Sequence, residues 1–272
     1  MVTTSTTRGY PPEFTIAFVV HGDVPLLERT IPTTIKTLCH GTTRSYDLLL
    51  VIDGAETAPV PDILARAHTE WGIDEVRLRW RSRHRAGGDP SNNGHVHLPP
   101  AKGRFLLSLE GDVVAFRAGD GDVLDAVAYA FEACPQLALA TRIDDHDCWQ
   151  WGLEEVGPPF GQGIRSVNRV SSHFLIYELP RATRVMRSAG GPPADQFHDS
   201  DVQWFNYEDW LSKTFARGAG PGIGYFDELP IRVFHCDAKV APASALYTRR
   251  LDVRLRVFEE RRKLVESGRR GA

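Results

Sequence analysis

Two acidic residues that follow a short apolar segment in mid-chain are the first candidates for chemistry. Residues 104–109 are expected to form a buried strand, and Glu110-Gly111-Asp112 follows directly. Side chains alternate along a strand, so the two carboxylates point the same way if the extended geometry continues. Mg²⁺ and Mn²⁺ prefer oxygen ligands, and one or two carboxylates usually hold Mg²⁺ together with substrate phosphates. The same residues are also ordinary turn chemistry, so the motif alone predicts either a metal site or a polar turn.

Other predicted strands end in similar polar residues. Residues 14–20 and 46–52 are apolar, β-branched runs typical of strands buried on both faces, and residues 75–80 form a third. Helical spacing of apolar residues covers 25–38 and 61–71 between them. This alternation predicts a parallel sheet with helices on its faces, whose ligands bind beyond the carboxyl ends of the strands. The polar strand ends expected together at that edge are His21-Gly22-Asp23, Asp53-Gly54 and Glu110-Gly111-Asp112.

The second half of the chain continues with mixed elements. We expect a packing helix over 122–134, strands over 137–141, 174–177 and 231–234, and a long loop over 186–202 that is a lid, a binding loop or disordered. A further helix contains Trp210 and Leu211, and Glu208-Asp209 is expected at or near its N-terminus, where the helix dipole favours acids. The strand over 231–234 leads to His235-Cys236-Asp237.

The segments between these elements offer binding groups with two interpretations each. Arg81, Arg83, Arg85 and Lys102 in and after a Gly/Pro-rich loop form either a solvated basic loop or a counter-charge for a diphosphate. His95 and His97 in that loop are a weak metal-ligand pattern.

Tryptophans lie among acids in the loop-rich segment 144–163. Trp149 and Trp151 either stack on a sugar or polar acceptor, or form a satellite hydrophobic cluster.

Bulk properties exclude several classes of protein. The chain has 272 residues, 42% of them hydrophobic, which is enough for one large α/β domain or two small ones. A net charge of −3 gives no reason to expect nucleic-acid binding. The four cysteines form no CxxC pair, which argues against a zinc ribbon or disulfide framework and favours a cytoplasmic location. Residues 1–13 read as a flexible leader rather than a signal peptide, and we expect no transmembrane segment.

The C-terminal segment is basic and helical in pattern. Residues 245–272 contain nine Lys and Arg residues against four acids, with apolar residues at helical spacing. This pattern predicts a charged surface helix that packs on the domain or on a second copy in a homodimer, or, as an alternative, a helix that binds acidic membrane surfaces.

The order of these motifs resembles family 2 of the glycosyltransferases, which are inverting enzymes with the GT-A fold. The similarity spans roughly residues 14–237, with Glu110-Gly111-Asp112 in place of the family's DxD motif. It includes the strand over 14–20, Asp53, the Glu208-Asp209 pair opening a helix that ends at glycine, and His235. The resemblance implies a Rossmann-like, mostly parallel central sheet flanked by helices, and the pattern of the C-terminal segment adds a helical extension to it.

We therefore expect a GT-A glycosyltransferase domain over 14–240, followed by the basic helix of 241–272, which lies beyond the resemblance. Within the domain, residues 14–112 would bind the nucleotide-sugar and residues 113–240 the acceptor.

The family's functional residues carry over onto matching positions. The resemblance implies transfer of a sugar from a nucleoside-diphosphate sugar, most often a UDP-sugar, to a small soluble acceptor: a small molecule, a sugar or a peptide. Asp112 would be a direct ligand of Mn²⁺ or Mg²⁺, together with His235 and with Glu110, which acts directly or through water or the ribose. Asp209 would be the general base, and Glu208 would orient the acceptor or replace the base.

Two further sets of residues complete the expected site. The nucleotide-sugar would contact Val20, His21, Gly22, Asp53, Arg85, Lys102, Glu110 and Gly111. The acceptor would contact Trp149, Trp151 and Trp210. Alternatives are a nucleotidyltransferase on a similar sheet, a non-catalytic nucleotide-sugar or glycan-binding protein and, more remotely, a metallohydrolase that uses His95, His97 and His235.

Overall fold

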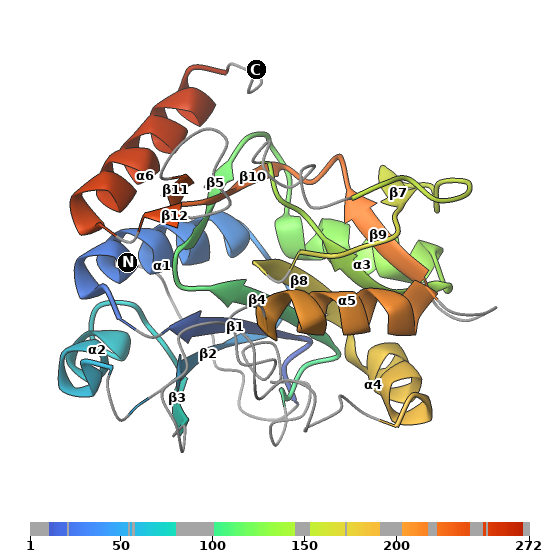
Figure 1. The fold of residues 1–272 in the computed structure, drawn as a ribbon, viewed down its shortest axis with the longest axis horizontal. Helices are drawn as coiled ribbons and strands as arrows, with labels where there is room; N and C mark the ends of the chain where they lie inside the picture. The colour runs from blue at the N-terminus through green and yellow to red at the C-terminus, as the bar shows by residue number, and fades with distance from the viewer. Residues whose placement is uncertain are drawn as a thin grey trace.

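A mixed sheet of eight strands forms the centre of the molecule, with helices on both faces (Figure 1). The structure is a computed structural model. It describes residues 11–20, 22–53, 55, 58–79, 101–144, 153–171, 173–190, 203–216, 222–239, 247–248 and 250–268. The strand order is β3-β2-β1-β4-β8-β6-β9-β7, and four of the seven pairings in this sheet are parallel. The fold is therefore the α/β architecture that the sequence predicts.

The first half of the chain builds the parallel part of the sheet. Its strands are β1 (Phe14–Val20), β2 (Tyr46–Asp53), β3 (Glu75–Arg79) and β4 (Phe105–Glu110). The helices α1 (Val24–Leu38) and α2 (Val60–Ala67) connect the first three strands. Every residue of β1 is buried, which explains why this strand is a continuous apolar run without alternation.

The second half adds strands of both directions. The elements are α3 (Val123–Ala133), β6 (Leu137–Thr141), β7 (Ile164–Ser166), β8 (Phe174–Glu178), α4 (Leu179–Ser188), α5 (Gln203–Ala216) and β9 (Gly222–Phe226). β8 lies between β4 and β6 and is antiparallel to both. The start of β8 therefore lies beside the end of β4, because neighbouring antiparallel strands run in opposite directions.

Alternate side chains of the central strands pack into two layers. Phe14, Ile16 and Phe18 of β1 belong to the core cluster that contains the apolar sides of α1, α2 and α3. Ala17 and Val19 belong to a second cluster that contains Leu211 and Phe215 of α5 and residues of α4. The two clusters bury both faces of the sheet, so the ends of its strands are left for chemistry.

A smaller layer joins the C-terminal helix to the sheet. β5 (Val113–Arg117) pairs antiparallel with β10 (Ile231–His235), and β11 (Ala238–Lys239) pairs with β12 (Tyr247–Thr248). Helix α6 (Leu251–Glu266) contacts α1 and β5, and Figure 1 shows α6 (red) beside α1 (blue). Phe258 of α6 lies in an apolar cluster with Phe116 of β5 and Phe234 of β10. The C-terminal helix thus packs on the domain, as one of the sequence interpretations predicts.

Several expected boundaries need correction. Glu208 and Asp209 lie in the second turn of α5, which begins at Gln203, so dipole stabilisation at the helix terminus does not explain them. The loop expected over 186–202 begins later, because α4 continues to Ser188. The C-terminal helix begins at Leu251 rather than at residue 245, since residues 247–248 form a short strand.

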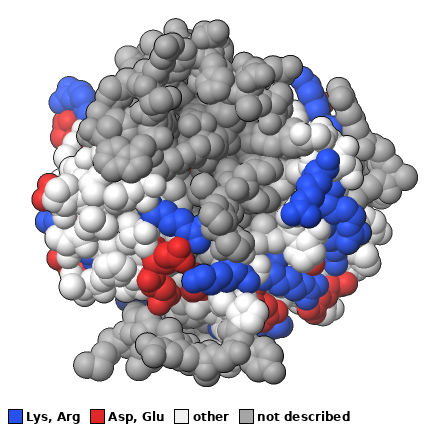
Figure 2. Space-filling model, turned by 90° about the horizontal axis from the view of Figure 1, so that it is seen from below, with Lys and Arg blue, Asp and Glu red and all other residues white. Residues whose placement is uncertain are grey.

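One face of the molecule carries charges of both signs. On the face seen in Figure 2, the Lys and Arg side chains that the structure describes lie beside Asp and Glu side chains. Within the described residues, no helix is both long enough and apolar enough to span a bilayer.

Candidate functional site

Polar side chains from separate parts of the chain meet at the carboxyl edge of the parallel strands. The register pairs Val19 of β1 with Glu110 of β4, and Val20 with Ile52 of β2. The three strands therefore end at nearly the same level. The polar residues after them share one edge, as the sequence predicts for Asp23, Asp53 and Glu110.

Gly111 allows the turn after β4 to approach β1 and α1 closely. A Cβ atom on Gly111 would lie 2.7 Å from Leu27 Cδ2 and 2.9 Å from Val20 Cγ1. The Gly111 N–H donates to Val19 O at 2.8 Å, and the buried Thr30 hydroxyl donates to Gly111 O at 2.6 Å. These contacts hold the backbone between Glu110 and Asp112 in one place, so only glycine fits here without displacement of a neighbour.

The same turn directs the two acids to different partners. The chain does not continue as an extended strand through Gly111 and Asp112, which form a turn between β4 and β5. Glu110 Oε2 contacts His173 Nδ1 at 2.9 Å, whereas Asp112 Oδ2 lies 3.3 Å from His235 Nε2. The extended geometry that the sequence argument assumed does not continue, but each carboxylate still has a ligand atom within 4.8 Å of a ligand atom of His235.

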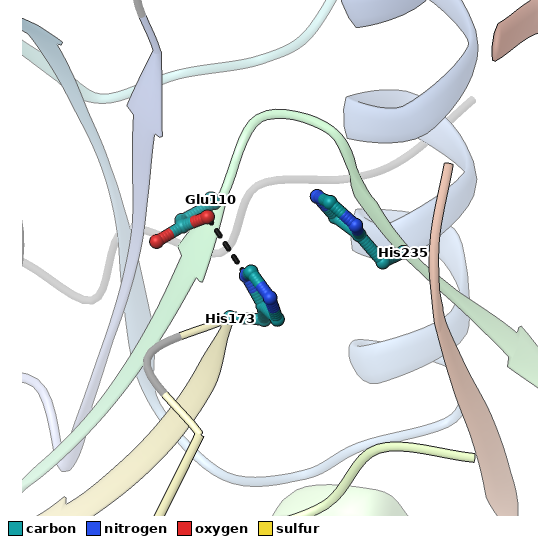
Figure 3. A group of neighbouring side chains, drawn as sticks. All are labelled: Glu110, His173 and His235. Atoms are coloured by element: carbon teal, nitrogen blue, oxygen red, sulfur yellow. Dashed lines mark hydrogen bonds and ion pairs between the residues drawn. The ribbon is translucent and has the colours of Figure 1, made fainter. Parts of the chain in front are cut away.

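Glu110, His173 and His235 form a compact group (Figure 3). Each offers one ligand atom, and these atoms lie within 4.8 Å of one another. The imidazole rings of His173 and His235 are stacked, with centroids 4.3 Å apart and an interplanar angle of 16°. His173 precedes β8, and its carbonyl accepts a hydrogen bond from the Glu110 N–H at 3.3 Å, so strand pairing positions the imidazole.

Arg254 of α6 lies among three carboxylates at the same edge. Its Nη2 lies 2.6 Å from Asp112 Oδ2, and it also forms ion pairs with Asp23 and Asp237. The Arg254 side chain is only 7% exposed. Such burial of a guanidinium requires paired carboxylates, which these residues supply.

Backbone contacts fix two of those carboxylates. Asp23 adopts a left-handed conformation with φ of 55° before α1, and its carbonyl accepts from the N–H of Leu26 and of Leu27. The Cys236 N–H donates to Asp112 O at 2.8 Å, which ties the end of β10 to the turn after β4.

Burial and neighbouring charges shift the pKa values of these groups. Burial raises the pKa of Asp112, but the charges of His235 and Arg254 outweigh it and hold that pKa well below its usual range. Burial lowers the pKa of His235, and the neighbouring Asp112 carboxylate reverses this, so the net direction is upward. Burial likewise lowers the pKa of Arg254, but Asp112, Asp237 and Asp23 raise it overall. The edge therefore holds an ionised Asp112 carboxylate in a partly dehydrated environment.

The donor atoms at this edge suit a divalent cation. Asp112 Oδ1 is buried and accepts no hydrogen bond from any residue that the structure describes. Asp112, His235 and Asp237 form a second group with ligand atoms within 4.8 Å of one another, and it shares His235 with the first. Oxygen and imidazole ligands at such separations fit the residue types that bind Mn²⁺ and related ions.

The structure brings together some of the expected site residues and separates one of them. Glu110, Gly111, Asp112 and His235 are neighbours, as the contacts above show. The expectation that Lys102 contacts the nucleotide-sugar needs correction. Lys102 precedes β4, at the opposite end of the strand from Glu110, and its Nζ pairs with Glu75 at 3.1 Å. Six residues of strand put it about 20 Å away from Glu110. Lys102 therefore does not lie at this edge.

Other candidates lie partly or wholly outside the described residues. His21, Arg85, Trp149 and Trp151 lie outside them, as do His95 and His97. The backbone of Asp53 ends β2, but its side chain is not among those described.

The candidates on α5 are described unevenly. Glu208 and Asp209 are placed as positions of this helix, without their side chains. Trp210 is partly buried and packs against the second core cluster, which contains Leu211.

Sequence reasoning missed two contributors, His173 and Arg254. His173 stands directly before an expected strand, and polar residues at strand ends were the signal that identified Glu110. Its strand runs opposite to β4, however, which the local sequence does not reveal. Arg254 is one basic residue among several in its segment, so nothing in the sequence distinguishes it from its neighbours.

Comparisons with known proteins identify the fold. No family model matches the sequence, and no curated protein matches it either. Among solved structures, S. aureus TarS 1–349 in complex with UDP-GlcNAc has a TM-score of 0.50 at 13% identity, covering 94% of this chain and 66% of that one. S. aureus TarS has a TM-score of 0.51 at 11% identity, covering 82% of this chain and 36% of the other.

A third similar structure is the mannosyltransferase PcManGT from Pyrobaculum calidifontis in complex with GDP-Man and Mn²⁺. It has a TM-score of 0.49 at 14% identity, covering 83% of this chain and 57% of that one. This chain thus spans about one third to two thirds of the length of the proteins that it resembles. The chain has the α/β fold of GT-A glycosyltransferases, as the sequence resemblance implies.

Proposed function

We propose that the protein is an inverting glycosyltransferase that uses a nucleoside-diphosphate sugar. The observation that carries this proposal is the convergence of Glu110, Asp112 and His235 at the carboxyl edge of a GT-A-like sheet. In open α/β sheets this edge is where ligands bind. A nucleotidyltransferase also uses such an edge, but no specific observation favours it here.

A UDP-sugar is the donor that the comparisons support best. One of the solved structures with this fold is a complex with UDP-GlcNAc, and the match to it covers 94% of this chain. In the proposal, Val20, Gly22 and Asp53 at the ends of β1 and β2 contact the nucleotide. His21 and Arg85, which lie outside the described residues, contribute to the same donor site in the proposal.

The proposed step is a single in-line displacement at the anomeric carbon of the sugar. A hydroxyl oxygen of the acceptor forms the new bond as the bond to the diphosphate breaks, and the bonding electrons leave with the diphosphate. Asp209 takes the hydroxyl proton, while Glu208 orients the acceptor. A Mn²⁺ or Mg²⁺ ion held by Glu110, Asp112 and His235 would neutralise the leaving diphosphate when bound. The acceptor is proposed to be a small molecule, a sugar or a peptide that contacts Trp149, Trp151 and Trp210.

The remaining predictions from the sequence concern organisation. The division into a nucleotide-sugar part over 14–112 and an acceptor part over 113–240 is part of the proposal. So is a homodimer formed through the C-terminal helix. Helix α6 contacts α1, β5 and β11, and in the proposal exposed residues of this helix contact the second copy. A cytoplasmic location stays a prediction from the cysteine pattern.

The first test combines nucleotide binding with donor turnover. Calorimetric titration of UDP, GDP and dTDP, each with and without Mn²⁺, should show tight binding of one nucleotide only. Release of free sugar from the matching donor, with water as acceptor, should proceed with inverted anomeric configuration by NMR. Asp209→Asn should keep nucleotide binding but reduce turnover by about 10²-fold or more, because the general base is lost.

A matched control and two outcomes decide the proposal. Asp252→Asn makes the same carboxylate-to-amide change at an exposed position of α6 and should leave both readouts unchanged. Absence of nucleotide binding under every metal condition would contradict the transferase proposal. Turnover by Asp209→Asn equal to that of the wild type would reject Asp209 as the base.

A further inference from the structure

Arg254 of the C-terminal helix contacts carboxylates on three separate segments of the carboxyl edge. Asp23 lies between β1 and α1, Asp112 lies in the turn after β4, and Asp237 follows β10. The guanidinium forms an ion pair with each of them, and its Nη2 lies 2.6 Å from Asp112 Oδ2. One side chain from α6 therefore joins three strand ends that are far apart in the sequence.

Each of these segments also carries a residue of the proposed donor site. Gly22 directly precedes Asp23, His235 lies two positions before Asp237, and Asp112 itself belongs to that site. A displacement of a reacting group by about 1 Å can cost about 10²-fold in rate. Whatever holds the three carboxylates in place therefore also holds the residues that are proposed to contact the donor.

The contacts of Arg254 depend on the shape of its guanidinium as well as on its charge. Nη1 pairs with Asp23, Nη2 with Asp112 and Nε with Asp237, so each nitrogen faces a different carboxylate. A lysine ammonium is a compact point charge and lacks this planar, three-way geometry. Arg254 uses only Oδ2 of Asp112, and Oδ1 accepts no hydrogen bond from the described part of the chain. The guanidinium thus orients this carboxylate and leaves one of its oxygens for another ligand.

Apolar packing one turn further along α6 holds Arg254 at the edge. Phe258 lies four positions after Arg254 and therefore on the same side of the helix. Its ring centroid is 5.5 Å from that of Phe116 in β5, and its side chain is 3% exposed. The Arg254 side chain is 7% exposed, so its ion pairs lie in a partly dehydrated space where charges interact strongly. The helix therefore presents this cation in a fixed position.

A contribution to stability does not by itself account for this arrangement. Well-packed apolar residues of similar volume often replace a buried group of ion pairs without loss of stability. Three acids at an edge that receives a diphosphate would also repel one another and that ligand. The guanidinium offsets part of this negative charge and keeps the acids from moving apart.

We propose that Arg254 is a positioning residue of the donor site, which holds the segments of Asp23, Asp112 and Asp237 in their arrangement before the donor binds. The C-terminal helix then contributes to donor binding without contacting the donor. This inference rests on the proposed function in assigning the edge to a nucleotide-sugar, whereas the order of the three segments is measurable without any nucleotide.

The first experiment measures hydrogen exchange of the full chain without nucleotide. Labelling times are chosen so that β6 stays protected. Under these conditions Arg254→Met should speed exchange at least about 10-fold in the peptides that contain Asp23, Asp112 and Asp237. Faster exchange confined to α6 would overturn the proposal.

Two controls separate positioning from stability. Leu124→Ala is a fully buried change in α3 that also lowers global stability, and it should leave the three peptides as in the wild type. Arg256→Met removes an exposed guanidinium from the same helix and should change no peptide outside α6. Equal loosening of the three peptides by Leu124→Ala would reduce the role of Arg254 to stability and overturn the proposal.

The second experiment measures UDP affinity by calorimetry in the presence of Mn²⁺. Arg254→Met should weaken binding about 10-fold or more, as is usual when a residue that orients a ligand-binding group is lost. Arg254→Lys keeps the charge but not the geometry and should be weakened to within about 3-fold of Arg254→Met. Wild-type affinity in Arg254→Lys would show that charge alone suffices, which overturns positioning.

Asp23→Asn tests whether Arg254 acts through its partners. Asp23 has a φ of 55°, a conformation that asparagine also adopts readily, so this change removes the charge and keeps the backbone. The double variant with Arg254→Met should bind UDP no more weakly than Arg254→Met alone, because both changes break the same pair. Additive losses would overturn action through Asp23.

The two experiments also separate this inference from the proposed function. Absence of nucleotide binding by the wild type would reject the assignment to a donor, and with it the proposed function. Unchanged exchange in Arg254→Met, with UDP bound normally by the wild type, would reject only the positioning role of Arg254.

Discussion

Replacement of Arg254 by methionine is the most informative perturbation of this edge. Methionine keeps much of the apolar stem but removes the guanidinium from three carboxylates. The Arg254 side chain is 7% exposed, and those of Asp237 and Asp112 are 11% and 22% exposed. Removal of one partner from a buried ion pair costs about 3–5 kcal/mol, because the other charge stays buried without compensation.

The lower end of that range applies here. Asp23 is 40% exposed, so water compensates its charge and its pair contributes little. We expect Arg254→Met to lower the free energy of unfolding by about 3 kcal/mol, which corresponds to a fall in Tm of about 6–12 °C for a chain of this size. Urea unfolding followed by tryptophan fluorescence, with calorimetry for Tm, measures both quantities.

The pH dependence identifies the cause of the loss. The pKa of Asp112 in the folded protein lies below its ordinary value, so its pairs stabilise the fold above pH of about 4 and do so less as pH falls. In Arg254→Met, the part of this stabilisation that comes from the pair between Asp112 and the guanidinium is absent at every pH. The difference in stability between wild type and variant should therefore be largest near pH 7 and should narrow by about 1 kcal/mol toward pH 3.

Arg256 of the same helix provides the control. Its side chain is 67% exposed and lies 3.8 Å from Glu260, so Arg256→Met should cost less than about 0.5 kcal/mol at any pH. Equal losses in the two variants, or a difference that widens on acidification, would refute the assignment of Arg254 as a buried counter-charge.

Two further predictions concern the turn after β4 and the partly buried thiol of Cys39. Gly111→Ala should lower the free energy of unfolding in urea by about 1–3 kcal/mol, because its Cβ would meet Leu27 and Val20. The control Gly22→Ala should cost less, because its Cβ would meet no described atom within 4 Å. Equal losses in the two variants would contradict the steric explanation. Burial raises the pKa of Cys39 to about 12, so iodoacetamide at pH 8 should label it about 10³-fold more slowly in the folded protein than in urea, by peptide mass spectrometry. Because the unfolded chain then loses the thiol proton at a lower pH than the folded protein, the free energy of unfolding should fall as pH rises above about 9. Labelling of Cys39 at the same rate in the folded protein as in urea would contradict its burial.

Local sequence was sufficient for many of the elements and for part of the candidate site. The expected strands over 14–20 and 137–141 have the bounds that the structure gives them. A strand buried on both faces must be apolar along its whole length, and polar residues then mark its end. The same reasoning identified Glu110 and Asp112 at a strand end.

Local sequence did not identify β5. Residues 113–117 follow the turn at once and bind β10, which lies more than a hundred residues further along the chain. A strand whose partner is so distant has no turn signal beside it that defines a hairpin.

Tertiary structure alone decided which other side chains join the site. His173 meets Glu110 because β8 enters the sheet antiparallel between β4 and β6, and that direction depends on pairing with both neighbours. Arg254 becomes the buried cation because Phe258 packs against Phe116, which turns one face of α6 toward Asp112. The sequence by itself determined where the carboxylates and the strands of the parallel part of the sheet occur, since these depend on residues close along the chain. The partners of the carboxylates depend on contacts between segments far apart in the chain, and only the packed fold determines those.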